Sequence, residues 1–285
     1  MSNQKKDLGT QLIQRTEKAK GKSNSKALDA LKAGVKRLCK SGGWQDYLDF
    51  LNKFHDYSWG NRILIWSQMS TASHCAGFRA WQNKFKRSVV KGQKGLAILA
   101  PIIVKDRDST DKNATKLVGF RVEHVWDISQ TEGEDTPEKP QSPKRLRGAD
   151  AKAKAALKTL RGRAKALDLK VTVQDLSHMP GCGGYLEPAT GSIVLAKGAH
   201  TSQRAKTLAH EIAHWVLEHG RGAKVNRAVA EVEAESTAYV VMNALGLDAA
   251  DYSFAYVAGW SGGRDSVILS VAGRVSQAAD TILDR

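Results

Sequence analysis

The spacing of apolar residues predicts helices followed by two strands in the first half of the chain. The stretch WQDYLDFLNKFHDYSWGNRILIWSQM carries apolar residues at helical intervals, and GFRAWQNKFKR continues as a short helix. A glycine-punctuated turn, KGQKG, precedes LAILAPIIV and LVGFRVEHVW, which are rich in branched residues and favour strands. This order indicates an α+β domain over residues 43–128.

A proline-rich segment separates this domain from a second one. Residues 129–149 hold Pro137, Pro140 and Pro143, half of the six prolines, and we expect an exposed linker there. Beyond it the pattern predicts an Ala- and Lys-rich helix, strands in LKVTVQDL and GSIVLA, and two further helices. We therefore predict a second domain over residues 150–285. The Lys-rich residues 1–42 are expected to form a loose helical arm.

The charge balance adds a polyanionic partner to the prediction of a two-domain protein. The chain has 44 Lys and Arg against 29 acids, a formal net charge of +15. No apolar run is long enough for a membrane span, and the polar N-terminus does not resemble a signal peptide. The three cysteines lie far apart and form no metal-binding pair. We expect a cytoplasmic protein with no membrane segment and a nucleic-acid partner.

The segment TLAHEIAHWVLEH predicts a metal-binding helix. One helical turn separates His210 from His214, so both imidazoles can point at one ion, and Glu211 lies beside that face. Apolar residues occupy the opposite face, as packing requires. The alternative is a buried helix that contains two histidines by chance. The spacing favours a zinc ion, Zn²⁺, with Glu211 as the catalytic base.

A catalytic zinc site needs a third protein ligand, and two glutamates compete for that place. His219 lies five residues beyond His214 on the same predicted helix, so it would point well off the metal. On the helix VAEVEAESTAYVV we favour Glu231 as the ligand. Glu235 would then accept a hydrogen bond from a ligand histidine, although the two could be exchanged. Glu233 is expected to point away. The alternative for all three is a solvated acidic face.

Zinc chemistry at this helix would be hydrolytic. The ion lowers the pKa of a bound water towards ~7, and Glu211 would take its proton and pass it to a leaving amine. The segment YLEPATGSIVLA would form strands beside the cleft, where an exposed edge could pair with an extended peptide. A protein or peptide substrate is therefore implied.

A basic, aromatic window in the first domain predicts a single-stranded nucleic acid as the partner. From Tyr57 to Lys105 there are 49 residues without Asp or Glu, and eight of them are basic. Single-strand binding requires cations for phosphates and exposed rings for bases. The alternative is that the rings form the core and the charges are merely solvated. The candidate contacts are Arg62, Arg79, Trp81, Lys84, Lys86, Arg87, Lys91 and Lys94.

Four segments in order resemble the antirestriction proteins of the ArdC type, which conjugative plasmids and related mobile elements carry. They are AGFRAWQNKFKRSVVKGQKGLAILAPI, VEHVWDISQTEG, LAHEIAHWVLEH and EVEAESTAYVVMNALGLD, within roughly Trp44 to Trp260. The resemblance implies an N-terminal domain that binds single-stranded DNA and a C-terminal zincin-like metallopeptidase domain of the gluzincin type. It also implies protection of incoming DNA from restriction. The chain lacks the histidine expected four residues after His214.

Three functions remain open from the sequence. In the first, the DNA-binding half carries the antirestriction activity alone. In the second, a DNA-dependent protease clears proteins from single strands. In the third, a regulatory peptidase cuts a repressor and uses DNA only for localisation.

Overall fold

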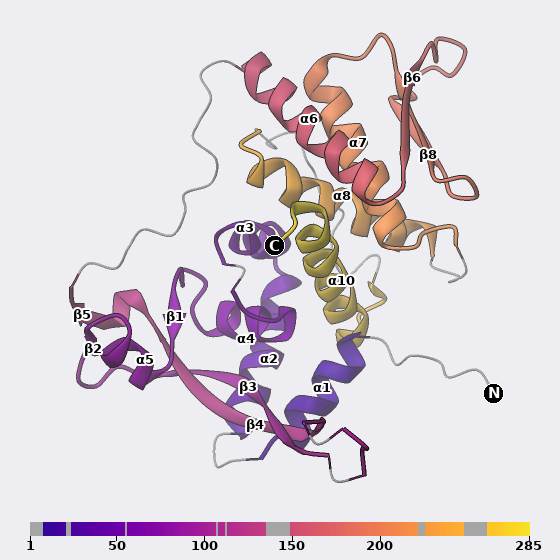
Figure 1. Cartoon of the computed structure of the whole chain (residues 1–285). Coiled ribbons are helices and arrows are strands. Elements are labelled where there is room, and N and C mark those ends of the chain that lie inside the picture. Colours follow the sequence, from indigo (N-terminus) through magenta and orange to yellow (C-terminus); the bar gives the residue numbers. More distant parts are fainter. Residues whose placement is uncertain are drawn as a thin grey trace. The chain divides into compact units, whose positions relative to one another are not determined.

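The computed structural model describes residues 8–20, 24–54, 56–106, 108–111, 113–134, 149–221, 226–247 and 261–285. It divides into two compact units (Figure 1). Unit 1 comprises Met1–Pro137 with Gly263–Gly273, and unit 2 comprises Glu138–Gly262 with Arg274–Arg285. Most of the predicted linker, residues 135–148, lies outside the described residues. Among the described residues, no helix is long and apolar enough to cross a membrane.

Unit 1 has mixed helix and sheet, as the apolar pattern predicts. Its sheet is antiparallel in the order β1-β4-β3, and β2 pairs separately with β5. The helices are α1 (Leu8–Lys18), α2 (Asn24–Leu38), α3 (Gly43–Lys53), α4 (Trp59–Gln68) and α5 (Phe78–Asn83). The strands are β1 (Cys75–Ala76), β2 (Arg87–Val89), β3 (Leu96–Lys105), β4 (Thr115–Asp127) and β5 (Thr131–Gly133). A single 3-10 turn, η1 (Ile128–Gln130), joins β4 to β5.

Helices α1 and α2 belong to the core of unit 1, in contrast to the loose arm that the composition predicts. Ala27, Leu31, Val35 and Leu38 form a buried stripe along α2, which packs against α4 and β3. Their spacing of four, four and three residues places them on one helical face. The many lysines between them occupy the solvent side. The lysine content therefore concealed an ordinary amphipathic helix.

Two amide side chains of α4 close the free edge of β3. The Asn61 amide accepts from the Leu99 N–H at 2.9 Å and donates to the Leu99 carbonyl at 3.0 Å. Gln68 repeats this pattern with Ala97 at 2.8 and 3.0 Å. Because β3 is an edge strand in the order β1-β4-β3, these bonds satisfy groups that would otherwise invite pairing with another chain.

Unit 2 places a small mixed sheet against a helical layer. Its strands have the order β6-β8-β7, with β6 parallel and β7 antiparallel to the central β8. Helix α7 packs against α6, α8 and the edge strand β7. The elements are α6 (Ala149–Ala166), β6 (Lys170–Gln174), β7 (Gly184–Glu187), β8 (Ser192–Ala196), α7 (Thr201–Val216) and α8 (Arg227–Ala244).

The C-terminal helix α10 (Asp265–Leu283) is shared by both units. The predicted second domain, residues 150–285, includes all of this helix, whereas residues 263–273 belong to unit 1. There Gly9 lies so close to α10 that a Cβ would meet the Ser266 carbonyl oxygen at 1.9 Å. Buried apolar residues recur from Ile268 to Ile282 along this helix, so periodicity alone gives no sign of the division.

Candidate metal centre

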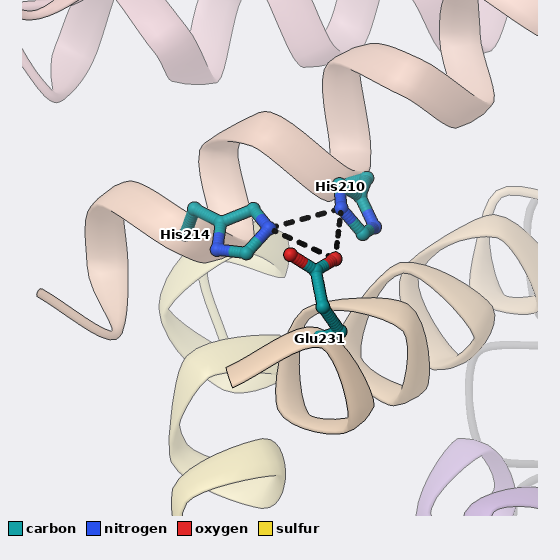
Figure 2. A group of neighbouring side chains, drawn as sticks. All are labelled: His210, His214 and Glu231. Carbon is teal, nitrogen blue, oxygen red and sulfur yellow. Dashed lines mark hydrogen bonds and ion pairs between the residues drawn. The ribbon is translucent and has the colours of Figure 1, made fainter. Parts of the chain in front are cut away.

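Three predicted ligands meet between α7 and α8. The Nε2 atoms of His210 and His214 lie 2.9 Å apart, and Glu231 Oε2 lies 3.5 and 3.7 Å from them (Figure 2). Among the described residues this is the one group of three or more His, Cys, Asp or Glu side chains that could hold a metal ion. Two imidazole nitrogens and one carboxylate oxygen form a donor set suited to zinc and to other divalent transition metals.

Small and apolar residues make this convergence possible. Leu208 and Ile212 are fully buried on one side of α7, which leaves the two histidines on the other. On α8, Ala234 and Ala238 are also fully buried, and the two helices pack against each other. Alanine at these positions allows the helix backbones to come close, so that Glu231 reaches both imidazoles.

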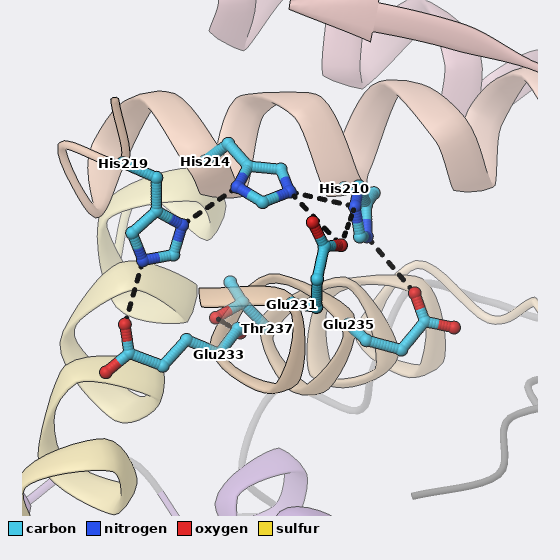
Figure 3. A network of polar contacts seen from close by, with 7 residues as sticks. All are labelled: His210, His214, His219, Glu231, Glu233, Glu235 and Thr237. Atoms are coloured by element: carbon cyan, nitrogen blue, oxygen red, sulfur yellow. Dashed lines mark hydrogen bonds and ion pairs between the residues drawn. The ribbon is translucent and has the colours of Figure 1, made fainter. Parts of the chain in front are cut away.

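Glu235 lies behind His210 rather than among the converging ligand atoms. Its Oε2 is 3.1 Å from His210 Nδ1, a contact that Figure 3 shows. Its Oε1 is 3.3 Å from Lys206 Nζ. Burial disfavours the charged carboxylate, but the hydrogen bond with His210 and the Lys206 ammonium outweigh it and lower the pKa of Glu235. A charged Glu235 orients the His210 ring, which is the role expected for an acceptor beside a ligand histidine.

The sequence reasoning missed a second set of contacts behind His214. Helix α7 ends at Val216, and Glu218 adopts a left-handed φ of 60° that turns the chain back. His219 Nδ1 thereby lies 2.8 Å from His214 Nδ1, and His219 Nε2 lies 2.8 Å from Glu233 Oε2. Glu233 lies outside the group of three candidate ligands, but it is not a solvated acid, because its side chain is buried against His219 and Arg274. The sequence-based prediction extended the helix through His219, so the contact between His219 and His214 was not foreseen.

Glu211 lines the same cavity as the three candidate ligands. The cavity has a volume of about 590 Å³ and is also bordered by the backbone of β7. Burial raises the pKa of Glu211 to about 7, although His210 and the backbone N–H of Leu186 act in the opposite direction. A carboxyl group that titrates near neutral pH is suited to taking up and returning a proton.

The electrostatic surroundings keep His214 neutral. Burial, followed by the neighbouring His210 and His219, lowers the pKa of His214 to about 3. An imidazole binds a metal only in its deprotonated form. His214 is therefore in the form required of a ligand throughout the neutral pH range.

Replacing Glu211 should stabilise the metal-free protein in a pH-dependent way. Its pKa is 4.5 in the reference state and about 7 in the folded protein, so its stabilising contribution is present below pH 4.5 and lost as the pH rises through 7. Glutamine does not titrate. We therefore expect the melting temperature of Glu211→Gln, relative to the parent, to rise between about pH 4.5 and 7 and then level off.

This comparison requires chelator-treated protein and thermal unfolding at several pH values. Glu187→Gln is the matched control, because Glu187 is exposed at the end of β7 and does not line the cavity, so the same acid-to-amide change involves no buried carboxyl group. If the melting temperature of Glu211→Gln exceeded that of the parent by the same amount at pH 5 and pH 8, Glu211 would not be a buried carboxyl group with a raised pKa.

Two of the predicted DNA contacts lie in the core of unit 1 and need correction. The Arg62 side chain is 5% exposed and donates from Nε to the Tyr57 carbonyl oxygen at 2.6 Å. The Trp81 ring is fully buried and donates from Nε1 to the Trp126 carbonyl oxygen at 2.9 Å. Both side chains fill the interior of unit 1, so Arg62 cannot contact a phosphate and Trp81 cannot stack on a base.

Arg87 also has a structural role. It donates from Nε to the Thr131 hydroxyl at 2.8 Å and from a second nitrogen to the Thr131 carbonyl at 2.9 Å. It further contacts the carbonyls of Gly133 and Glu134. These bonds fasten β2 to β5, so replacing Arg87 would disturb the fold as well as any ligand contact.

The remaining predicted contacts are exposed. Phe78 is 45% exposed beside them and packs edge-on against Trp126 at 5.9 Å between ring centroids. Trp126, which lies outside the acid-free window, was not among the predicted contacts. Its partial exposure in β4 could only be recognised once the strand had been placed. We call the exposed predicted cations the basic surface: Arg79, Lys84, Lys86, Lys91 and Lys94.

The fold and the side chains thus define a two-domain α+β protein with a metallopeptidase-like His-Glu-x-x-His site. Family models agree with this class: residues 22–146 match the N-terminal domain of the anti-restriction factor ArdC, and residues 164–257 match the IrrE N-terminal-like domain of the M78 peptidases. Together these matches span most of the chain. The family models therefore assign the chain an ArdC-type N-terminal domain followed by an IrrE-like second domain.

Solved structures and a curated relative agree with this assignment. The crystal structures of the antirestriction protein ArdC from plasmid R388, metal-free and Mn(II)-bound, are 22% and 19% identical, each with a TM-score of 0.52. Each likeness covers 80% of this chain and 84% of the other, and it establishes the fold. An uncharacterized Bacillus anthracis protein, pXO2-81, is 26% identical over 252 residues, covering 75% of this chain. The chain spans only 42% of that relative.

Proposed function

We propose that the chain binds single-stranded DNA with unit 1 and carries a zinc peptidase site in unit 2. The observation that carries the peptidase half is the convergence of His210, His214 and Glu231 on one point, with Glu211 in the same cavity. The ArdC-type domain and the basic surface support the DNA half. The antirestriction role is proposed to rest on coating of incoming single strands.

The chain's own residues supply orientation and proton transfer in the peptidase half. Zinc in such a site acts as a Lewis acid and makes water a better nucleophile near neutral pH. Glu211 takes the proton of the attacking water on its carboxylate and returns it to the leaving amine. Strand β7 lies at the edge of its sheet and borders the cavity, so its free side can pair with an extended peptide.

Zinc is favoured over manganese by the donor set. The protein of the R388 structure was crystallised with Mn(II), which shows that a metal binds that relative. In the present chain two of the three candidate donors are imidazole nitrogens, which bind zinc more strongly than manganese. Zinc and manganese should therefore be compared directly in the metal-binding test.

The exposed groups of unit 1 support the proposal of single-strand binding. The basic surface offers five cations for phosphates, and the neighbouring Phe78 and Trp126 offer ring faces or edges for bases. A cavity of about 700 Å³ adjoins it and is lined by Lys26, Lys94 and His124, among others. This combination suits a flexible strand with unstacked bases better than a regular duplex.

The first test is metal content. The purified parent should hold about one zinc per chain. His210→Ala should lose it, and Glu231→Gln should bind more weakly because one of three ligands is removed. The measurement is elemental analysis after dialysis, with competition between zinc and manganese.

His178→Ala provides the matched control, since His178 is an exposed histidine of the same unit. It should keep the zinc of the parent. Equal zinc in the parent, His210→Ala and Glu231→Gln would refute the proposed site.

A further inference from the structure

A buried line of polar contacts runs from His214 to the C-terminal helix. His214 Nδ1 lies 2.8 Å from His219 Nδ1, and His219 Nε2 lies 2.8 Å from Glu233 Oε2 (Figure 3). The other oxygen of Glu233 accepts from Arg274 Nε at 2.8 Å. Arg274, on α10, also donates to the carbonyl of Leu217 at 2.7 Å, just after the end of α7.

The burial of this line means that its charges must be compensated. His219 is 6% exposed and Glu233 is 1% exposed. A carboxylate buried to this degree is tolerated only with hydrogen-bonded partners, and here Arg274 provides the opposite charge. Arginine always carries its proton and can only donate, so it fixes Glu233 as a charged acceptor.

The fixed carboxylate determines where the ring protons lie. Because Glu233 can only accept, His219 Nε2 must carry a proton, and a neutral His219 then has its lone pair on Nδ1. His214 must in turn carry its proton on Nδ1, directed at His219. The lone pair of His214 is thereby left on Nε2, the atom that faces His210 and Glu231.

We propose that His219, Glu233 and Arg274 are positioning residues that hold His214 in the tautomer with its metal-binding lone pair on Nε2. This inference rests on the metal site of the proposed function. The two ligand histidines are then held differently. His210 is held by the partly exposed Glu235, whereas His214 is held by the buried His219 and Glu233, whose relay ends on a helix far along the chain from the His-Glu-x-x-His motif.

Glu233→Gln provides a test because the relay predicts an inversion. Arg274 can only donate, so it should hold the new amide oxygen and leave the amide NH₂ facing His219. His219 would then accept at Nε2 and donate from Nδ1, which would move the His214 proton to Nε2. We expect zinc affinity to fall by ~10–100-fold, the usual effect of losing such a supporting contact.

A second change should rescue this loss. In Glu233→Gln with Arg274→Met, the amide is free to turn its oxygen towards His219 and restore the original proton order. We expect the double variant to bind zinc more tightly than Glu233→Gln alone. A purely structural role for the Glu233–Arg274 pair predicts the opposite, since two losses would accumulate.

The experiment combines zinc affinity by chelator competition with nitrogen NMR of the histidine rings in the metal-free full chain. The parent should show a lone pair on His214 Nε2, a readout that requires no variant to fold. Melting temperatures monitor folding, and Glu187→Gln, at an exposed position outside the relay, is the acid-to-amide control.

The outcomes are distinct. A parent with His214 protonated on Nε2 would overturn the inference, and so would a folded Glu233→Gln with the zinc affinity of the parent. A double variant weaker than the single one would also overturn it. A parent that binds no zinc would instead overturn the proposed function, and this inference with it.

Discussion

Glu211→Gln is expected to remove nearly all peptide turnover while protection of DNA from restriction survives. Glutamine keeps the size of the side chain and leaves His210, His214 and Glu231 unchanged, so the metal should remain. Without a group that accepts the proton of the attacking water, hydrolysis should fall by ~10²–10⁴-fold. The basic surface lies in unit 1 and does not include Glu211, so DNA coating should be unaffected.

The deciding measurement is plasmid transfer into a restricting host, together with zinc content and DNA affinity of the same variant. Protection lost while zinc and DNA affinity stay intact would make proteolysis the working mechanism. Peptidase activity that rises with added single-stranded DNA would then indicate a DNA-dependent protease, and one specific cleaved repressor would indicate a regulatory peptidase. The near-neutral pKa of Glu211 is the observation that favours these alternatives.

Neutralising four lysines of the basic surface should remove both salt-dependent DNA binding and protection. Lys84, Lys86, Lys91 and Lys94 are exposed, and changing all four to Gln spares Arg87, which fastens β2 to β5. Each phosphate contact with a single strand contributes about −0.7 to the slope of log affinity against log salt. Four contacts give about −3, and the variant should lose that much of the slope.

A charge-matched control separates a surface from a general charge effect. Changing Lys32, Lys36, Lys40 and Lys53 to Gln removes the same charge from other exposed positions of unit 1. That variant should keep most of the slope and the protection. Equal losses in both variants would mean that binding depends only on net charge.

Phe78→Ala should lower the affinity for single-stranded DNA without changing the slope of log affinity against log salt, because a ring contributes stacking rather than charge.

The sequence was most informative where a chemical requirement coincides with a helical period. His210, Glu211 and His214 could be placed because one turn of helix fixes their relation, and Glu231 and Glu235 because one turn separates them on the next helix. His219 could not, since its position depends on a left-handed residue after α7. Glu233 could not either, because its main partner Arg274 lies far along the chain.

The DNA-binding residues were harder to predict for a physical reason. Phe78 and Trp81 lie three residues apart on the same short helix, yet Trp81 is fully buried and Phe78 is 45% exposed. An aromatic ring suits a core and a base-stacking surface equally well. Only the packing of α5 against β4 separates the two roles, and that packing is not local in sequence.

The division of α10 has a consequence for how the chain is made. Ribosomes deliver residues 138–262 before residues 263–273, so unit 1 waits for its last segment while nearly all of unit 2 is synthesised. Until then the faces that receive Ile268, Leu269 and the close approach at Gly9 have no covering helix. Domains usually fold in the order in which they emerge, but this one is completed late. The nascent N-terminal half therefore presents an apolar surface to chaperones throughout that interval.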